Sequence, residues 1–409
     1  MFLKPIDNII SGQFTYALPD ERIAAYPVSR RDDSQLLIRR KQGTLERDTF
    51  GNLASYLEKD CHMVFNNSRV IPARLIFKKP SGSRIELFCL KPVEPAGYAA
   101  SLSSGKECTW ECMAGNLKRF RENTLSLKVR VNNEDCTLKA EKIRHLGNTT
   151  EVRFTWDNGS VTFAGLLSAA GQTPLPPYIK RNPEEIDRSR YQTIYSRVEG
   201  SVAAPTAGLH FTEAVFEQIR AKNISVHEVT LHIGAGTFQP IKTPSVLDHE
   251  MHAEFFSVSG SLIAELEKLD SGIVAVGTTT VRTIESLYWL GVKILQANKN
   301  SRQTGLHLGQ WEAYCLPQEV PVKQAFVALN QWLEKWGGPD FAASTKLMIV
   351  PGYKFRVVNT LITNFHQPGS TLLLLVAAFM GEQWKETYQY ALDNGFRFLS
   401  YGDSSILFA

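Results

Sequence analysis

The stretch Ile273–Leu290, with the sequence IVAVGTTTVRTIESLYWL, gives the strongest indication of the fold. It opens with four small or β-branched apolar residues, continues with Gly-Thr-Thr-Thr, and ends in a longer segment rich in apolar residues. The short apolar run predicts a buried strand, and the segment after the small-residue turn predicts a helix. A strand that leads through such a turn into a helix is typical of α/β proteins.

Alternating strands and helices are also expected on both sides of this stretch. Before residue 75, the pattern predicts a strand at 33–40, an amphipathic helix at 49–60, and a strand running into a polar turn at 63–70. The later elements expected in the same way are a helix at 213–223, a strand at 225–234, a helix at 261–272, a strand at 346–355 and a helix at 372–382. Residues 291–345 contain several tryptophans and give no strong signal.

The segment from Leu75 to Trp156 has a different character. Short strand candidates follow one another with turn residues between them, and no long helix pattern interrupts them. Evenly spaced short strands are typical of a small barrel or sandwich. The sequence therefore predicts an α/β domain formed by residues 1–74 and 157–409, interrupted by an inserted all-β, barrel-like domain at 75–156.

This inserted segment is also the basic part of the chain. It contains fourteen Lys and Arg against nine Asp and Glu, a net charge of +5, whereas the whole chain carries +4. A basic segment in a nearly neutral protein indicates an acidic partner such as nucleic acid. An ordinary solvated face is the alternative interpretation of the same charges.

The composition is that of an ordinary globular protein, with 43% hydrophobic and 21% charged residues among 409. No signal-peptide pattern opens the sequence, and the longest apolar run, at 370–380, is too short to span a bilayer. The six cysteines show no paired Cys-x-x-Cys spacing, which favours reduced thiols. We therefore expect a cytoplasmic protein without a membrane anchor.

Four loops combine small residues, hydroxyls and polar side chains at the ends of expected strands or the starts of expected helices. They are VAAPTAGLHFT at 202–212, TLHIGAGTF at 230–238, VGTTTVRT at 276–283 and TNFHQPGST at 363–371. Ligands of open α/β sheets bind where strands end and loops begin. We therefore expect His210, Gly234, Thr279 and His366 to surround one cavity.

The histidines allow more than one interpretation. His210 and His232 stand among apolar residues, where a histidine satisfied within the core is the commoner case. His249 and His252, in DHEMHAEFF, are three residues apart with Glu254 close behind, which is half of a metal site. Because the His-Glu-x-x-His order is absent, a surface loop is the preferred interpretation, and no metal is expected.

Several longer motifs together resemble one family. They are, in chain order, VFNNSRVIPARL, PLPPYI, RYQTIYSRVEGSVAAPTAGLHFT, TLHIGAGTFQP, HEMHAE, AVGTTTVRTIES, LITNFHQPGSTLLLLVAAF and RFLSYGD. In this combination the chain resembles the S-adenosylmethionine:tRNA ribosyltransferase-isomerases of queuosine biosynthesis. The resemblance runs from about Tyr16 to Asp403 and is weak only in the β insertion and in residues 291–345.

The resemblance implies an activity and its partners. Such enzymes transfer the ribosyl portion of S-adenosylmethionine to a 7-aminomethyl-7-deazaguanine at the tRNA wobble position and isomerise it, which gives epoxyqueuosine, adenine and methionine. S-adenosylmethionine is then a consumed substrate, and no permanently bound cofactor is expected. The family fold, an α/β domain interrupted by a β-barrel, agrees with the division of the chain expected above.

The implied chemistry needs a base, an acid for departing adenine and groups that hold the substrates. His210 and His232 are the first candidates for proton transfer, with Glu254 and Asp403 as carboxylate alternatives. Arg69 and Arg282 are candidates to bind the methionine carboxylate, with a structural salt bridge as the alternative. The other expected substrate-binding residues are Asn66, Thr206, Gly234, Gly236, Thr237, Thr279, Asn364 and His366. The expected RNA-binding residues are Lys118, Arg119 and Arg121.

The sequence departs from the family pattern at several motif positions. Asn67 and Asn359 replace aspartates, Gln367 replaces a leucine, and Gly369 stands where a lysine or arginine is usual. An amide keeps the shape of a carboxylate but cannot take up a proton near neutral pH. If those aspartates act as bases, the chain is a catalytically altered or inactive paralogue that binds RNA or a different acceptor; if they only orient loops, the amides suffice. A metal hydrolase that uses His249 and His252 is a third hypothesis.

Overall fold

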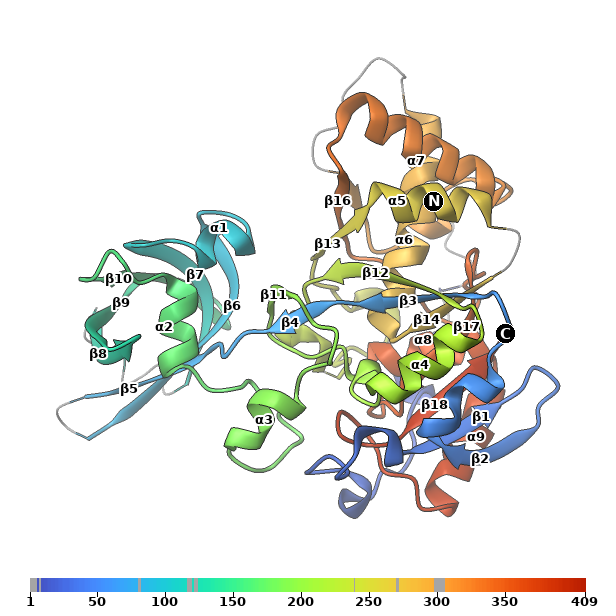
Figure 1. The fold of residues 1–409 in the computed structure, drawn as a ribbon, viewed down its shortest axis with the longest axis horizontal. Coiled ribbons are helices and arrows are strands. Elements are labelled where there is room, and N and C mark those ends of the chain that lie inside the picture. The colour runs from blue at the N-terminus through green and yellow to red at the C-terminus, as the bar shows by residue number, and fades with distance from the viewer. Residues whose placement is uncertain are drawn as a thin grey trace.

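The computed structural model contains two large sheets at opposite ends of the molecule (Figure 1). It describes residues 6, 9–79, 82–115, 120, 124–238, 240–269, 272–297 and 306–409. One sheet has ten strands and the other six, and a short two-stranded pair lies between them. The fold is therefore an α/β part with a mixed sheet, into which a six-stranded antiparallel sheet is inserted.

The ten-stranded sheet has the order β15-β16-β13-β12-β3-β14-β17-β18-β1-β2. Its centre, from β12 through β3 and β14 to β17, is parallel, and antiparallel pairs flank this centre on both sides. The strands are β1 (Gln35–Arg39), β2 (Leu45–Thr49), β3 (His62–Asn66), β12 (Ser225–Leu231), β13 (Glu254–Ser259), β14 (Ile273–Val276), β15 (His307–Leu308), β16 (Asp340–Thr345), β17 (Val358–Asn364) and β18 (Ser404–Phe408).

Both faces of the centre of this sheet, at β3, β14 and β17, are buried, as the apolar sequences of these strands predict. In β3, Val64 packs into the larger core with the helices α5, α6 and α8, while Met63 and Phe65 pack into a second core with α4. Successive residues of a strand point to opposite faces, so one strand serves two cores. The helices of this part are α3 (Glu185–Arg190), α4 (Glu213–Ala221), α5 (Gly260–Lys268), α6 (Thr278–Gln296), α7 (Val322–Trp336), α8 (Thr371–Met380) and α9 (Gln383–Asp393).

The strand, turn and helix expected at 273–290 are confirmed as β14 and α6. All four residues of β14 are buried, and Gly277 makes the turn with a φ of +91°. Helix α6 is buried from Thr278 to Val292 because it lies between the sheet and α7. A Cβ at Gly291 would lie 2.3 Å from the Ala325 carbonyl oxygen, so a glycine is needed where the two helices cross.

Two expected elements differ from the structure. The segment 346–355 forms no strand, although it is strongly apolar. Instead, side-chain and backbone groups in and just after this segment bind the carboxylate of Glu285 on α6. This carboxylate accepts hydrogen bonds from the Tyr353 hydroxyl at 2.8 Å and the Val357 N–H at 2.9 Å. The helix expected at 49–60 is shorter and is a 3₁₀ helix, η4 (Phe50–Tyr56). Among the described residues, the other 3₁₀ helices are η1 (Ser11–Gln13), η2 (Asp20–Arg22), η3 (Arg31–Asp33), η6 (Thr206–Gly208), η7 (Ala235–Phe238), η8 (Val246–Asp248) and η9 (Glu312–Tyr314).

The inserted sheet is antiparallel and has the order β5-β6-β7-β10-β9-β8. Its end strands β5 and β8 also lie against each other, so the sheet curls towards a barrel. Helix α2 packs on this sheet, and its Phe163 ring contacts Trp110, Phe154 and Trp156. The elements of this part are β5 (Arg74–Lys78), β6 (Arg84–Glu94), α1 (Tyr98–Leu102), β7 (Glu107–Gly115), β8 (Thr124–Val131), β9 (Glu134–Leu146), β10 (Thr149–Trp156) and α2 (Phe163–Ala170).

The parallel strand pair β4 (Ser68–Val70) and β11 (Val198–Ser201) lies between the two large sheets (Figure 1). Because β4 follows directly after β3, the chain leaves the large sheet at its centre and enters the inserted sheet. Within the described residues, no helix has the length and apolar character needed to cross a membrane.

Candidate active site

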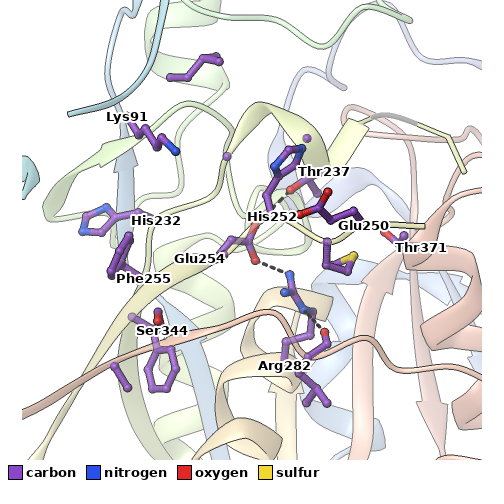
Figure 2. A pocket seen from close by; sticks show the side chains of 18 of the residues that line it. Lys91, His232, Thr237, Glu250, His252, Glu254, Phe255, Arg282, Ser344 and Thr371 are labelled. Atoms are coloured by element: carbon purple, nitrogen blue, oxygen red, sulfur yellow. Dashed lines mark hydrogen bonds and ion pairs between the residues drawn. The ribbon is translucent and has the colours of Figure 1, made fainter. Parts of the chain in front are cut away.

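A cavity of about 1070 Å³ lies between the inserted sheet and the large sheet. Its walls come from both parts of the chain, and Figure 2 shows its lining from close by. The inserted part contributes Leu90, Lys91, Pro92, Tyr98, Glu111, Met113, Asn148 and Thr149. The larger part contributes the loop after β12, the segment 249–257, Arg282 of α6, residues 342–344 and the first turn of α8. A cavity with walls from two sheets suits a ligand that both parts must hold.

The loop after β12 forms one edge of this cavity. His232, Gly234, Gly236 and Thr237 line it in the order of the TLHIGAGTF motif. A Cβ at Gly236 would lie 2.5 Å from Cδ2 of His252, so the absence of a side chain lets the histidine ring pack on the loop. Gly234 has no other atom within 4 Å of its Cβ position and faces open space. The glycines therefore shape a cavity wall and make room for a side chain.

Glu254 and Arg282 form a buried ion pair in this wall. Glu254 is the first residue of β13, Arg282 lies in the second turn of α6, and both side chains are only 7% exposed. The Thr237 hydroxyl donates to Oε1 of Glu254 at 3.3 Å, and Nε of Arg282 donates to the Leu347 carbonyl at 3.1 Å (Figure 2). Nη2 of Arg282 is buried and has no hydrogen-bond partner in the described chain. Because Arg282 also lines the cavity, its guanidinium lies beside the space where an anionic group of a ligand would bind.

His232 lies where the two parts of the chain meet. Its ring stacks on Tyr98 of the inserted part, with centroids 4.3 Å apart and an interplanar angle of 27°. A Cβ at Gly200, which has a φ of +140°, would come within 2.8 Å of both rings. Burial lowers the pKa of His232 to about 4, and its buried Nδ1 has no partner among the described residues. The ring is therefore neutral near pH 7 and can accept a hydrogen bond or a proton from a ligand.

The segment 249–257 lines the cavity beside the loop after β12. Gln310 holds it in place by donating to the His249 carbonyl at 2.6 Å and accepting from the Met251 N–H at 3.0 Å. His252 is electrostatically coupled to Glu111 of the inserted sheet. Burial would raise the pKa of Glu111, but hydrogen bonds from Lys91 and Thr149 and the nearby positive charges lower it. The carboxylate thus stays ionised on the inserted side of the cavity.

This geometry changes the interpretation of DHEMHAEFF. The segment is not an ordinary surface loop, because His249, His252, Glu254 and Phe255 all line the cavity. Among the described residues, the group of possible metal ligands that lie close together does not include His249 or His252. Figure 2 shows His252 beside Thr237 and Glu254, and Phe255 beside His232.

The structure brings six of the expected site residues to the cavity: His232, Gly234, Gly236, Thr237, Glu254 and Arg282. The expectation that His210, Gly234, Thr279 and His366 surround one cavity is wrong, since only Gly234 of these four lines it. The reason is topological: the loop at 202–212 follows β11 of the short strand pair, and the loop at 363–371 follows β17, which lies three places from β12 in the wide sheet. Most side chains of both loops are buried.

His210 and Asp403 lie apart from this cavity in a buried polar cluster. Nδ1 of His210 is 2.7 Å from the Ser34 hydroxyl, and its Nε2 is 3.4 Å from Oδ1 of Asn364. Asp403 accepts hydrogen bonds from the Gln35 N–H at 3.1 Å and from the backbone N–H of residue 397 at 2.8 Å. These hydrogen bonds hold β1, β17 and the C-terminal segment together, so the cluster stabilises the fold.

The remaining expected residues are also outside the cavity. His366 is buried and bonds to the Thr363 hydroxyl at 2.9 Å, and burial lowers its pKa to about 3. Asn66 accepts from the Leu231 N–H at 3.1 Å and so ties β3 to β12.

Arg69 is half-exposed, with Glu199 4.0 Å away. Two further threonines do not line the cavity: Thr206 in η6 and Thr279 in α6. Lys118, Arg119 and Arg121 lie outside the described residues.

A model of one protein family matches almost the whole chain. The family is described as "Queuosine biosynthesis protein", and the match covers residues 11–407. The chain belongs to this family.

Curated relatives agree over the full length. The S-adenosylmethionine:tRNA ribosyltransferase-isomerase of Trichlorobacter lovleyi is 36% identical and covers 97% of this chain and 98% of its own. Proteins of the same name from Anaeromyxobacter sp. and Syntrophomonas wolfei are each 37% identical, over 97% and 96% of this chain and 98% and 96% of their own. A crystal structure of S-adenosylmethionine tRNA ribosyltransferase from Thermotoga maritima covers 97% of this chain and 99% of its own at 26% identity, with a TM-score of 0.45.

Asn67, where the resemblance implies an aspartate, has a well-defined structural environment. Its Nδ2 donates to Glu228 at 2.9 Å, its Oδ1 accepts from the Thr230 hydroxyl at 2.7 Å, and its backbone N–H donates to the Val229 carbonyl at 2.9 Å. An aspartate here would face the Glu228 carboxylate without a proton between them. The amide therefore fits its neighbours and does not line the cavity.

The other departures also lie away from the cavity lining. Asn359 is exposed at the start of β17, at the end of the strand opposite to the loop 363–371. Gly369 has a φ of +67°, which a glycine adopts without strain, and its N–H donates to the Phe14 carbonyl at 2.8 Å. Gln367 is partly buried in the same loop.

Several cavity residues were not expected from the sequence. Tyr98, Glu111 and Lys91 come from the insertion, and no local pattern connects them to the loop after β12. His249 and His252 were considered only as a half metal site. Their position in the chain between the TLHIGAGTF motif and Glu254 is the signal that could have placed them at this cavity.

Proposed function

We propose that this protein transfers the ribosyl moiety of S-adenosylmethionine to 7-aminomethyl-7-deazaguanine at the wobble position of tRNA. The ribosyl group isomerises to the epoxycyclopentane of epoxyqueuosine, and adenine and methionine leave. The full-length similarity to enzymes of this name supports the activity. The observation that carries the proposal for the site is the cavity between the two sheets, lined by the TLHIGAGTF loop and the Glu254–Arg282 pair.

The size of the cavity supports this substrate pair. Sites for single small ligands are usually about 300–1,000 Å³. A volume of about 1070 Å³ slightly exceeds this range, which supports room for S-adenosylmethionine and a nucleobase together. A nucleobase within tRNA must leave its stack to enter such a site, as bases do in other enzymes that modify them.

In this proposal Arg282 holds the methionine carboxylate of S-adenosylmethionine. Its unpaired Nη2 supplies the N–H group, and the neighbouring Glu254 fixes the guanidinium in place. Glu254 is also our first candidate for the base that removes the proton from the ribose carbon next to the sulfonium. His232, neutral near pH 7, is the second candidate for proton transfer. His210 and Asp403 are less suitable, because neither lines this cavity.

The deazaguanine base is proposed to lie near the inserted part. Phe255, 60% exposed, and Tyr98 offer aromatic faces at the cavity, and Glu111 offers an anionic acceptor for the aminomethyl group. We propose that residues 75–156 act as an inserted domain that grips tRNA phosphates, with Lys118, Arg119 and Arg121 among its contacts. S-adenosylmethionine is consumed, so the reaction needs no bound cofactor, and its tRNA substrate would place it in the cytoplasm.

Release of free adenine tests this function. The protein is incubated with S-adenosylmethionine and tRNA that carries the aminomethyl base, and adenine is quantified by chromatography. We expect one adenine for each epoxyqueuosine found in the digested tRNA. The matched control is the same tRNA with an unmodified guanine, which lacks the attacking amine and should give no modified nucleoside. Absence of adenine with the modified tRNA would contradict the proposal and favour a paralogue that only binds RNA.

A further inference from the structure

Two histidines and a glutamate meet on the large sheet at a place that the proposed reaction does not use. His62 begins β3, His227 lies in the neighbouring parallel strand β12, and Glu265 lies on α5. Ser225 pairs with His62, so His227 is two residues further along and points to the same face of the sheet. One nitrogen of each histidine and one carboxylate oxygen all lie within 4.8 Å of one another.

Two of the separations between these atoms are close to the ligand–ligand distances of a metal coordination shell. Nδ1 of His62 is 3.0 Å from Nε2 of His227, which is 3.3 Å from Oε2 of Glu265. Zinc–nitrogen and zinc–oxygen bonds of about 2.0–2.2 Å in a tetrahedron place neighbouring ligand atoms roughly 3.3–3.5 Å apart. The two imidazole rings are nearly parallel, with an interplanar angle of 13°.

Hydrogen bonds alone satisfy this arrangement poorly. Nε2 of His227 faces both Nδ1 of His62 and a carboxylate oxygen of Glu265. If Nε2 carries a proton, it donates to one of these two atoms and leaves the other without a bond from it. If Nε2 is unprotonated, it accepts from Nδ1–H of His62, but its lone pair then lies beside the Glu265 carboxylate. A cation between the three atoms would satisfy all of them at once.

We propose that His62, His227 and Glu265 bind one divalent transition-metal ion, with zinc as the preferred ion. Two imidazoles and a carboxylate are a common zinc ligand set, and a water completes the tetrahedron. The Glu265 side chain is 50% exposed, which gives the ion a path from solvent. This site is distinct from the cavity: it lies on β12 before the strand ends, whereas His232 follows the strand. The ion would join β3, β12 and α5.

Zinc binding by the untagged, full-length protein tests this inference. The protein is treated with chelator, dialysed, and titrated with zinc chloride in a calorimeter, and its melting temperature is measured with and without one equivalent of zinc. We expect one tight site and a higher melting temperature with zinc, because an ion that binds only the folded state stabilises it. Cobalt should replace zinc and give the visible absorption of a tetrahedral site.

The variants His227→Ala and Glu265→Gln identify the ligands. Loss of an outer partner of a metal site already weakens binding by about 10–100-fold, so loss of a ligand should weaken it at least as much. Glu265 is exposed enough that Glu265→Gln keeps the fold, which circular dichroism checks. His145→Ala, at an exposed histidine of β9, is the matched control and should bind zinc as the wild type does.

Two further controls exclude other zinc ligands. Cys315→Ser removes the exposed cysteine, and the double variant His249→Ala/His252→Ala removes the cavity histidines. Both should retain the tight site. The inference is overturned if the wild type binds no zinc at micromolar concentration, or if His227→Ala and Glu265→Gln bind it as tightly as the wild type.

Discussion

At the scale of single residues, the two glycines of the TLHIGAGTF loop have different environments. A methyl group at Gly236 would meet the His252 ring, whereas one at Gly234 would meet nothing within 4 Å. His252 is exposed, so Gly236→Ala should displace its ring without unfolding the protein. The local sequence does not distinguish the two glycines. Only the folded structure shows that His252 packs against Gly236 and that no side chain packs against Gly234.

The pair therefore gives a matched test. We expect Gly236→Ala to lower kcat/KM for S-adenosylmethionine by up to about 10²-fold, because a small misplacement of a site residue can cost this much. Gly234→Ala should have a clearly smaller effect, and both variants should melt within a few degrees of the wild type. Adenine release measures kcat/KM. A Gly234→Ala variant as impaired as Gly236→Ala would contradict the assigned contact with His252.

The buried histidines predict how stability depends on pH. Burial lowers the pKa of His210 and His232 to about 4 and that of His366 to about 3, from an ordinary value of about 6.5. Between these values the unfolded chain binds more protons than the folded one, so stability increases with pH. The contribution is complete above about pH 6.5 and is lost as the pH falls towards 4.

We therefore expect a lower free energy of unfolding at about pH 5 than at about pH 7.5, measured with urea. His366→Gln should reduce the difference between the two conditions, since it removes one buried group that titrates. His145→Gln, at an exposed position, should leave the difference unchanged. An equal pH dependence in the wild type and in His366→Gln would show that His366 does not carry this effect.

At the scale of elements, the sequence was sufficient where a local pattern and the tertiary contacts agree. The apolar run at 273–276 and the small-residue turn after it predicted both β14 and α6. The prediction succeeded because the apolar residues of both elements are buried in the structure. The run at 346–355 misled the prediction since burial there does not come from strand pairing. Its chain is held by Glu285 of α6, some seventy positions earlier, a contact that no local pattern contains.

The junction of β3 and β4 carries the departure at Asn67. Asn67→Asp would place a second carboxylate beside Glu228, with which Asn67 now shares a hydrogen bond of 2.9 Å. We expect a loss of about 1–3 kcal/mol in the free energy of unfolding, because the bond is replaced by repulsion. Turnover should change by less than about tenfold, since the residue does not line the cavity.

Urea unfolding and adenine release measure the two effects. Asn359→Asp is the control, because Asn359 is exposed at the start of β17 and should tolerate the carboxylate. A rise of about 10²-fold or more in the turnover of Asn67→Asp would contradict an orienting role and indicate a lost general base.

At the scale of the whole molecule, the sequence predicted the insertion but not its contacts with the larger part of the chain. Strand candidates and basic charge defined the segment, yet the stacking of Tyr98 on His232 depends on how the two sheets face each other. For the same reason His232, Glu254 and Arg282 were found from the sequence, while Glu111 and Lys91 across the cavity were missed.

The net charge of +5 on residues 75–156 leads to a prediction about tRNA binding. Replacing Lys118, Arg119 and Arg121 by alanine should weaken binding more at low salt than at high salt. The slope of log affinity against log salt should fall by about one for each phosphate group that the variant no longer neutralises. The control is alanine at Lys41, Arg220 and Lys323, three exposed cations of the larger part. An unchanged slope in the first variant would assign its residues to an ordinary solvated face.

The assignment of the reaction to the cavity between the two sheets is tested most directly by adenine release from the Glu254→Gln protein. Glutamine keeps the size of Glu254 but can neither take up a proton nor pair ionically with Arg282. With S-adenosylmethionine and aminomethyl-modified tRNA, we expect turnover at least about 10²-fold below wild type. Arg220→Ala, which breaks an exposed ion pair on α4, should retain full turnover. Undiminished adenine release by a folded Glu254→Gln protein would place the chemistry outside this cavity.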